Sequence, residues 1–235
     1  QVPAQDVCEE LAHLNFLGRS PTFCKCLQLI KRFAACDAPV LLQGETGTGK
    51  ELAARALHYL SGRCGAPFVP VNCGAIPDTL LESEFFGHES GAFTDARGTR
   101  KGMVALADTG TLLLDEVDSL SPKGQVALLR FMQDRTYRPV GGGRLLESGA
   151  RVLTSTNQDL SKLAQAGRFR QDLLFRLNVT AVTLPPLRAR REDIPLLVDH
   201  FLRQLSVRYS RPLGRPSSAA LQRLCGYPWP GNVRE

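Results

Sequence analysis

Residues 44–51 form the glycine-rich stretch Gly44-Glu45-Thr46-Gly47-Thr48-Gly49-Lys50-Glu51, around which the rest of the chain is organised. An apolar run, 40–42, precedes it and a helix-compatible segment, 52–57, follows it. A phosphate-binding loop requires this order of strand, glycine turn, lysine and helix, because backbone N–H groups then surround an anion at the positive end of the helix. Lys50 then reaches the outer phosphates as a point charge. We therefore predict a triphosphate site here, the alternative being a glycine-rich turn with a surface lysine.

A second motif supplies the acidic groups that work with such a loop. The run Leu112-Leu113-Leu114 is followed by Asp115-Glu116. At the C-terminal end of a strand, the first carboxylate can hold the water shell of Mg²⁺ and the second can polarise an attacking water. The general loop pattern also places Ser or Thr after the lysine as a magnesium ligand, whereas this chain has Glu51. The two motifs together predict hydrolysis of ATP or GTP with Mg²⁺ as cofactor.

Composition limits the remaining classes of protein. The 235 residues are 43% hydrophobic, enough for a sizeable core in one domain or in a large and a small one. The net charge of +6 comes largely from Arg, with the densest run at 188–191. That run could touch nucleic acid, but a solvated surface or a phosphate or subunit contact is the favoured interpretation. No helix-turn-helix or zinc-finger pattern is present, so DNA binding is expected only through a domain outside this chain.

The cysteines and the apolar runs favour a cytoplasmic protein. The chain has seven cysteines, without CxxC spacing, and we expect them to fill core positions as free thiols in a reducing compartment. Four scattered histidines predict no protein metal cage. No apolar run is long enough to cross a membrane, and no signal-peptide pattern occurs, so no membrane partner is expected. The chain lacks an initiator Met, and we interpret it as a fragment of a longer protein.

Strand and helix patterns alternate along the first four-fifths of the chain. A helix is expected after Thr22 as its cap, another at 76–86, and one from Pro122 to near 135. Buried strands are expected at 40–43, 68–72, 111–114, 151–156 and 179–184. This alternation is typical of a parallel α/β sheet with helices on both faces. Pro185-Pro186 marks a boundary, beyond which only helices are expected, at 192–209 and 217–225, with another beginning at Asn232.

At this point the sequence resembles a known family. The stretch Gly-His-Glu-Ser-Gly-Ala-Phe-Thr-Asp-Ala at 87–96 is similar to the signature of AAA+ transcription activators that act on sigma-54 RNA polymerase, also called bacterial enhancer-binding proteins. The resemblance extends over nearly the whole chain. Further matching motifs lie at 44–51, 71–73, 83–89, 115–116, 169–173, 184–188 and 229–235.

The resemblance implies the fold of an AAA+ P-loop NTPase. This is an α/β domain with a central parallel five-stranded sheet flanked by helices, here residues 1–186. A small C-terminal helical lid, residues 187–235, follows it and is cut before its last helix. The resemblance also explains Glu51, because the family's own phosphate loop carries Glu at this position, so that Mg²⁺ depends on Asp115, phosphate oxygens and water.

The resemblance further implies roles for single residues around the nucleotide. Asn72 holds Glu116 away from the attacking water until the partner is engaged, as an amide can restrain a carboxylate. Asn157 senses the γ-phosphate. Arg170 and Arg176 reach the nucleotide of a neighbouring subunit as arginine fingers, which couples hydrolysis to assembly of a ring, expected to be a hexamer. From spacing alone, both would be surface helix arginines. Arg234 is the arginine that the lid presents to the nucleotide.

The loop Gly91-Ala92-Phe93-Thr94-Asp95-Ala96 is implied to contact sigma-54, supported by the second loop at 138–149. Asp95 departs from the family, which has Gly there, and Asp tolerates positive φ only moderately. The first hypothesis is therefore an ATPase that remodels the sigma-54 RNA polymerase closed complex to activate transcription. The alternative is a nucleotide-binding regulator that oligomerises without remodelling sigma-54. Another AAA+ remodeller, such as a DNA helicase or an unfoldase, is a third and less favoured possibility.

Overall fold

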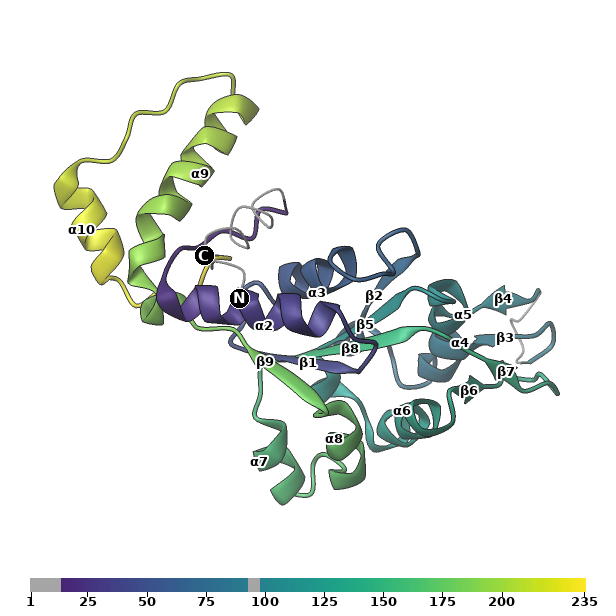
Figure 1. Ribbon diagram of the computed structural model, residues 1–235. Helices are drawn as coiled ribbons and strands as arrows, with labels where there is room; N and C mark the ends of the chain where they lie inside the picture. The colour runs from purple at the N-terminus through teal and green to yellow at the C-terminus, as the bar shows by residue number, and fades with distance from the viewer. Residues whose placement is uncertain (1–13, 93–97) are drawn as a thin grey trace.

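A five-stranded parallel sheet forms the centre of the computed structural model, which describes residues 14–92 and 98–235 (Figure 1). The strand order is β2-β5-β8-β1-β9, and every neighbouring pair is parallel. The strands are β1 Val40–Gln43, β2 Phe68–Asn72, β5 Thr111–Asp115, β8 Arg151–Thr156 and β9 Thr180–Thr183. The predicted parallel sheet is thus confirmed, and the C-terminal ends of all five strands meet at one edge, where parallel α/β sheets bind ligands.

Alternate residues of the strands supply two separate cores, one on each face of the sheet. Val40 and Leu42 of β1 pack with α2 (Pro21–Ala34) and α3 (Lys50–Tyr59). Leu41, between them, belongs to the core on the opposite face. This second core includes residues of the helices α4 Leu81–Phe86, α5 Met103–Ala107, α6 Pro122–Asp134, α7 Leu160–Gln165 and α8 Gln171–Leu177. The two-residue period of a strand therefore fixes which helices cover which face.

Two helix starts differ from expectation, each for a local reason. Helix α2 is capped by Ser20, not Thr22, because Pro21 takes the first helical position and the Ser20 hydroxyl accepts a hydrogen bond from Phe23 N at 3.4 Å. The helix expected at 76–86 is shorter and begins at Leu81. Ile76 is extended, with φ −98° and ψ 120°, since it precedes Pro77.

The segments expected to be long loops contain two small hairpins. Strands β3 (Gly87–His88) and β4 (Arg100–Lys101) pair antiparallel, as do β6 (Thr136–Tyr137) and β7 (Leu146–Glu147). The hairpins lie side by side, because Glu89 N donates to Val140 O at 3.0 Å and Val140 N donates to Gly87 O at 2.9 Å. Both project from the same end of the sheet in Figure 1.

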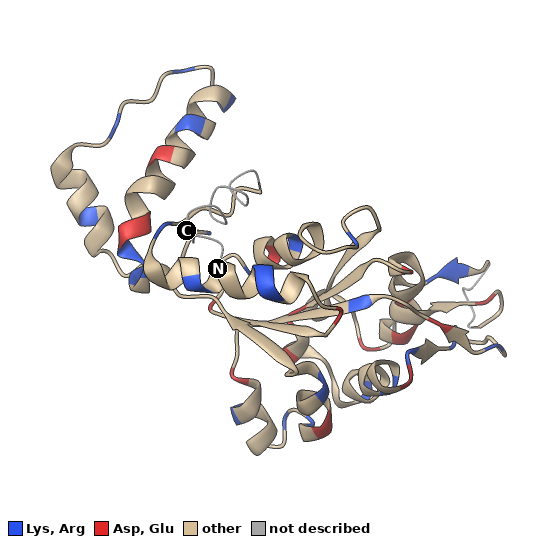
Figure 2. Ribbon diagram, in the orientation of Figure 1, with Lys and Arg blue, Asp and Glu red and all other residues tan. Residues whose placement is uncertain are grey.

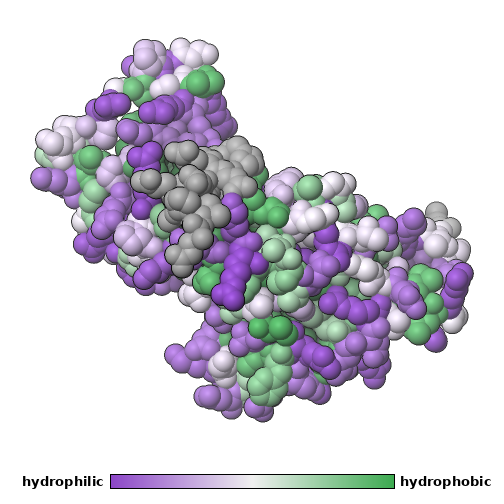
Figure 3. Space-filling model, viewed as in Figure 1, coloured by the Kyte–Doolittle hydropathy of each residue, from purple (hydrophilic) through white to green (hydrophobic). Residues whose placement is uncertain are grey.

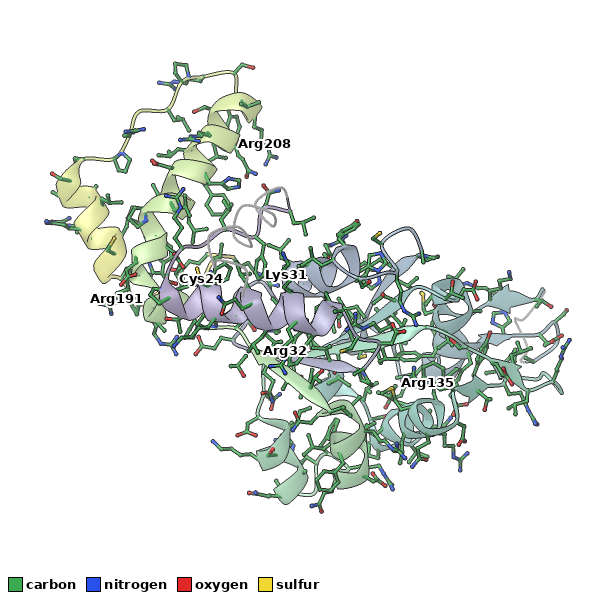
Figure 4. The ribbon with its side chains drawn as sticks, viewed as in Figure 1. Cys24, Lys31, Arg32, Arg135, Arg191 and Arg208 are labelled. Atoms are coloured by element: carbon green, nitrogen blue, oxygen red, sulfur yellow. The ribbon has the colours of Figure 1, made fainter. Side chains whose placement is uncertain are left out.

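The C-terminal segment 187–235, which we call the lid, lies at the opposite end of the molecule in Figure 1. It consists of α9 (Ile194–Arg208) and α10 (Ser218–Gly226), with Arg191 and Arg208 near the two ends of α9 (Figure 4). Its small core is built on Leu187, Ile194 and Leu197. Asn232, where another helix was expected to begin, has φ 55° and lies in a turn, and the three residues that follow it are too few to test for a helix.

The distribution of charged residues shows whether the chain has one basic face. Lys and Arg are interspersed with Asp and Glu over both parts of the chain (Figure 2), so the net charge of +6 does not gather into one basic face in this view. No helix among the described residues is long and apolar enough to cross a membrane.

Candidate nucleotide-binding site

The phosphate loop joins β1 to α3 as predicted. Gly47 and Gly49 have φ of 80° and 103°, a region that L side chains rarely adopt, and Gly49 is the residue before the first turn of α3. The ammonium of Lys50 folds back over the loop and donates to Gly44 O at 2.7 Å and Glu45 O at 3.1 Å. Burial lowers the pKa of Lys50, an effect that the nearby carboxylate of Asp115 opposes. A half-buried cation that is hydrogen-bonded to carbonyl oxygens is well suited to exchange them for phosphate oxygens.

A pocket of about 260 Å³ opens at this loop. It is lined by the loop and the start of α3, the ends of β5 and β8, and the last residues of the lid. The lining residues are Thr46, Gly47, Gly49, Lys50, Glu51, Leu52, Asp115, Glu116, Asn157, Val233 and Arg234. The structure therefore brings the loop, both predicted acids, Asn157 and Arg234 to one cavity from four separate parts of the sequence.

The two acids have different environments. Asp115 Oδ1 accepts from Glu116 N at 3.1 Å and from the hydroxyl of Ser155 on the neighbouring strand. These bonds fix the side chain of Asp115 at the end of β5. Glu116 follows with φ 54° and ψ 46°, an uncommon left-handed backbone for a non-glycine residue. Such strained residues cluster at functional sites, where the surrounding structure holds them in place.

Asn72 and Glu116 approach the same point without bonding to each other in the described part of the chain. Asn72 Oδ1 accepts from Gly74 N at 2.8 Å. A Cβ placed on Gly74 would lie 3.0 Å from Glu116 Oε2 and 3.3 Å from Asn72 Oδ1. The side chains of Asn72 and Glu116 therefore both lie beside Gly74. Restraint of Glu116 by Asn72 stays a prediction.

Asn157 and its neighbour connect the end of β8 to the site. Asn157 Nδ2 donates to Thr46 Oγ1 in the phosphate loop at 3.2 Å. The buried hydroxyl of Thr156 donates to Asp118 Oδ1 at 2.6 Å, and Gln158 Nε2 donates to Asp118 Oδ2 at 3.0 Å. Asn157 thus links the end of β8 to the phosphate loop at the lining of the pocket, and its role in sensing the γ-phosphate stays a prediction.

Comparison with protein families decides which class of protein has this arrangement. A family model described as "Sigma-54 interaction domain" matches residues 16–183, and one described as "AAA+ ATPase lid domain" matches residues 188–235. The chain belongs to the sigma-54 interaction domain family. The AAA+ fold with a helical lid, expected from the sequence, is confirmed by this match and by structural neighbours.

Similar proteins include whole regulators of which this chain covers a part. It is 48% identical to the Nif-specific regulatory protein of Herbaspirillum seropedicae over 94% of this chain and 41% of that protein. It is also 48% identical to the transcriptional regulatory protein ZraR of Salmonella typhimurium over 95% of this chain and 51% of that protein. A crystal structure of NtrX from Brucella abortus in complex with ADP has a TM-score of 0.86 and 36% identity, covering 94% of this chain and 49% of that one. The chain spans about half the length of these relatives.

In this member of the sigma-54 interaction domain family, three parts of the phosphate loop do not line the pocket. Gly44 contributes its carbonyl to Lys50, and the buried Thr48 donates its hydroxyl to Glu45 O at 2.8 Å. The Glu45 carboxylate accepts two hydrogen bonds from Arg188. The assignment of Gly44, Glu45 and Thr48 to nucleotide binding stays a prediction. For Gly44 and Thr48, the predicted contribution is to the shape of the loop.

Two residues that bind the phosphate loop, Arg188 and Asn232, were not predicted to do so from the sequence. Arg188 was expected to be a solvated or phosphate-contacting arginine, and Asn232 to start a helix. Instead, Asn232 is fully buried and its Nδ2 donates to Thr46 O at 3.0 Å and Glu45 Oε2 at 3.2 Å. These partners are 143 and 187 residues from Glu45, so no local pattern could reveal them. The available signal was that both lie within motifs shared with the family.

The two arginines expected to act as fingers lie away from the pocket. Arg170 precedes α8 and is held by Asp172, with Arg170 Nε–Oδ1 at 3.0 Å and Arg170 Nη2–Oδ2 at 2.7 Å. Arg176 is exposed in the last turn of α8. Phe175 beside it is 68% exposed, and hydrophobic surface is visible over the α7 and α8 lobe in Figure 3. Neither arginine lines the nucleotide pocket of its own chain.

The predicted sigma-54 loop is described only at its start. Gly91 is exposed with φ 81°, and Ala92 N donates to Glu89 O at 3.2 Å. Ala92 also packs on the second loop, since a Cβ on Gly141 would lie 2.7 Å from Ala92 Cβ. Phe93, Thr94, Asp95 and Ala96 lie outside the described residues. The start of the first loop therefore touches the second loop. The predicted support of the first loop by the second requires such a contact.

The donor set at the pocket suits a magnesium ion held mainly by nucleotide and water. Among the described residues, no group of three or more His, Cys, Asp or Glu could hold a metal ion. Asp115 has one oxygen occupied by Ser155 and Glu116 N, which leaves Oδ2 to accept from metal-bound water. Mg²⁺ keeps several waters and is commonly bound through one or two carboxylates plus phosphates. The residues present therefore fit this ion.

Proposed function

We propose that this chain is an ATP-hydrolysing motor domain that acts on sigma-54 RNA polymerase. The observation that carries the proposal is the convergence of Lys50, Asp115, Glu116, Asn157 and Arg234 on one pocket. The ammonium and backbone N–H groups bind phosphates, Asp115 orients Mg²⁺ through its water, and Glu116 accepts a proton from the attacking water. The structure of the NtrX relative in complex with ADP supports a nucleotide as ligand. Mg²⁺ supplies neutralisation of the phosphate charge when it is bound.

The proposal divides the chain into a nucleotide-binding α/β part, 1–186, and the lid, 187–235. Because Arg170 and Arg176 lie outside the pocket of their own chain, we assign them to the pocket of a second copy, in a ring that we propose to be a hexamer. An arginine supplied in trans stabilises developing phosphoryl charge only after assembly. The loop around Phe93 then transmits the ATP cycle to sigma-54, in the cytoplasm where transcription takes place.

The test is ATP hydrolysis by the wild-type chain and by Glu116→Ala at saturating Mg²⁺. We expect kcat to fall by about 10²- to 10⁴-fold, the contribution typical of a general base, while ATP still binds. Glu192→Ala, which removes an exposed carboxylate in the lid, is the matched control and should leave kcat unchanged. Equal rates for wild type and Glu116→Ala would remove Glu116 from this role.

A second candidate function rests on one residue. Asp95 stands where the family has Gly, and its charge lies at the proposed contact. In this alternative the chain binds nucleotide, oligomerises and regulates transcription without remodelling sigma-54. Mixing the chain with sigma-54 and a transition-state analogue of ATP separates the two functions. A stable complex supports the motor, whereas no complex, with recovery in Asp95→Gly, supports the alternative.

A further inference from the structure

One acidic side chain of the phosphate loop points away from the phosphates. Glu45 follows the first glycine of the loop, yet its carboxylate is not part of the pocket lining. It is bound by the guanidinium of Arg188, with Nη1–Oε2 at 2.7 Å and Nη2–Oε1 at 2.5 Å. Arg188 therefore neutralises the charge of this carboxylate next to the loop that is proposed to bind phosphates.

The same carboxylate also binds the end of the lid. Asn232 Nδ2 donates to Glu45 Oε2 at 3.2 Å and to Thr46 O at 3.0 Å. Its Oδ1 accepts from Leu187 N at 2.7 Å, at the first residue of the lid. Asn232 has no exposed surface and adopts φ 55°, a backbone that Asn tolerates better than most residues. One buried amide therefore links the phosphate loop, the beginning of the lid and its last turn.

These bonds bring the lid backbone directly onto the phosphate loop. Val233 N donates to Gly47 O at 3.1 Å. Gly231 O approaches so closely that a Cβ on Gly47 would lie 2.1 Å from it. The next residue, Arg234, lines the pocket. The backbone that leads into Arg234 is thus held against the phosphate loop.

We propose that Glu45 is a positioning residue, which holds Arg234 at the nucleotide through Arg188 and Asn232 and does not itself touch the nucleotide. This inference rests on the proposed nucleotide site and deepens it. It assigns Arg188 and Asn232, which the sequence analysis had not placed in the site, to the same task. Glu45, Arg188 and Asn232 are called the lid clamp below.

Two physical features separate the lid clamp from an ordinary surface ion pair. Exposed pairs contribute little because their side chains are free to move and are screened by water. The side chains of Glu45 and Arg188 are also close to half exposed, but the pair is bidentate and its carboxylate also accepts from a fully buried amide, which restrains the geometry. The hydrogen bonds from Arg188, and then that from Asn232, lower the pKa of Glu45 to about 2. The carboxylate of Glu45 is therefore ionised throughout the pH range in which such a chain would be assayed.

The first experiment measures binding of fluorescently labelled ADP with Mg²⁺ to the purified chain. In Glu45→Ala and in Arg188→Ala we expect Kd to rise about tenfold, equivalent to about 1.4 kcal/mol. Glu45→Gln, which can still accept from Asn232 and from one nitrogen of Arg188, should lie between wild type and Glu45→Ala. The double variant should be no weaker than either single one, because each change already removes the same interaction. In ATP hydrolysis KM should rise more than kcat falls.

The matched control is Arg191→Ala, three residues from Arg188. Arg191 is also exposed and is labelled at the base of the lid in Figure 4. It should leave both Kd and KM unchanged. Additive losses from Glu45→Ala and Arg188→Ala would contradict the proposal, as would a loss of kcat at unchanged Kd and KM.

A second measurement needs no nucleotide and separates the lid clamp from the proposed function. The amide of Val233 donates to Gly47 O, and the amide of Leu187 donates to Asn232 Oδ1. Hydrogen exchange of these two amides reports whether each bond remains formed. We expect exchange at both to become at least about tenfold faster in Glu45→Ala and Arg188→Ala, and to stay unchanged in Arg191→Ala. If wild type binds no ADP, the proposed function fails while this result still tests the lid clamp. Unchanged exchange in both variants would overturn it.

Discussion

The nucleotide pocket and helix α8 hold their charged groups in opposite ways. At the pocket, Asp115 is bound by Ser155, 40 residues away, and the adjoining Asn232 is bound to Thr46, 186 residues away, whereas Lys50 is bound within its own loop. On α8, Arg170 is bound only by Asp172, two residues away, and the side chains of both are close to half exposed. Arg176 lies exposed on the same helix. The carboxylate of Asp115 is thus held by a long-range contact, whereas the guanidinium of Arg170 is held by a neighbour in its own helix, although its backbone N–H donates to Gln125 Oε1 at 2.8 Å.

This difference indicates which groups can act within one chain. A side chain fixed by long-range contacts can only serve the site that those contacts build. An exposed arginine with a local partner keeps its freedom to exchange that partner for a phosphate of another molecule. This difference supports the proposal that the pocket binds the nucleotide and that α8 supplies charge to the pocket of a neighbouring copy. The following predictions test that division.

Arg170→Ala should have the largest effect on turnover. If the guanidinium acts in trans, kcat falls about 10³-fold, as for arginine fingers in other phosphoryl transfers, while Kd for ADP does not change. The control is Arg32→Ala, an exposed arginine on α2 that Figure 4 labels. A rise in Kd for ADP in Arg170→Ala would mean that Arg170 binds the nucleotide of its own chain.

Mixing two variants then tests whether Arg170 acts on the pocket of its own chain or on that of a neighbouring copy. Chains with Arg170→Ala have intact pockets, and chains with Lys50→Ala have intact arginines. A mixture of these two inactive variants should regain activity, because some pockets then face an intact Arg170. Lack of recovery in a mixture that forms rings would contradict the division between the two regions.

Lys50→Ala should have the second largest effect, on binding instead of turnover. Removing the half-buried ammonium takes away charge-assisted bonds to phosphate, each worth about 1.5–3 kcal/mol, so Kd for ATP should rise about 10²-fold. Titration with a fluorescent nucleotide measures this. Lys31→Ala on α2 changes the same residue type outside the pocket and should leave Kd unaltered. A Kd within a factor of three of wild type would show that Lys50 keeps its bonds to Gly44 and Glu45 when nucleotide binds.

The sequence alone was sufficient for the parts of this site that depend on consecutive residues. The phosphate loop, the Asp115-Glu116 pair and the strands that carry them follow from glycine spacing and apolar runs, and the structure has them at the C-terminal edge of the sheet. The sequence was less informative about which strands lie next to each other in the sheet. Sheet order puts β8 between β5 and β1, and no periodicity within a strand encodes its neighbour.

What the sequence could not reveal depended on tertiary contacts of polar residues. Asn232 resembled a helix start because Asn and the following residues suit one, but burial against Thr46 and Leu187 favours a left-handed turn. The hairpins at β3–β4 and β6–β7 have only two residues in each strand. Such short strands lack the alternation by which longer ones are predicted.

Phe175→Ala should have a moderate effect, on assembly. Phe175 is 68% exposed beside Arg170 and Arg176, and an aromatic anchor at a protein interface commonly contributes about 2 kcal/mol or more. We expect the dissociation constant for self-association to rise by about tenfold or more, as measured by sedimentation in the presence of nucleotide. Thermal stability of the monomer should not change. Leu29→Ala on α2, which is 39% exposed, is the control. Equal self-association of Phe175→Ala and wild type would separate α8 from the contact between copies.

Asp172→Asn should have the smallest effect and tests whether the local partner restrains Arg170. Asn can still accept from Leu173 N, as Asp172 Oδ1 does at 2.8 Å, so that the start of α8 is retained while the charge is lost. An exposed ion pair is worth at most about 1 kcal/mol. Because Arg170 must leave Asp172 to reach a phosphate, we expect kcat to rise about two- to fivefold at low salt. The gain should shrink as salt screens the pair in wild type. A fall in kcat would instead mean that Asp172 presents Arg170 to the neighbouring pocket. In that case α8 would be preorganised in the same way as the pocket. The arginine that acts on the phosphate, Arg170, and the carboxylate that orients it, Asp172, would lie only two residues apart.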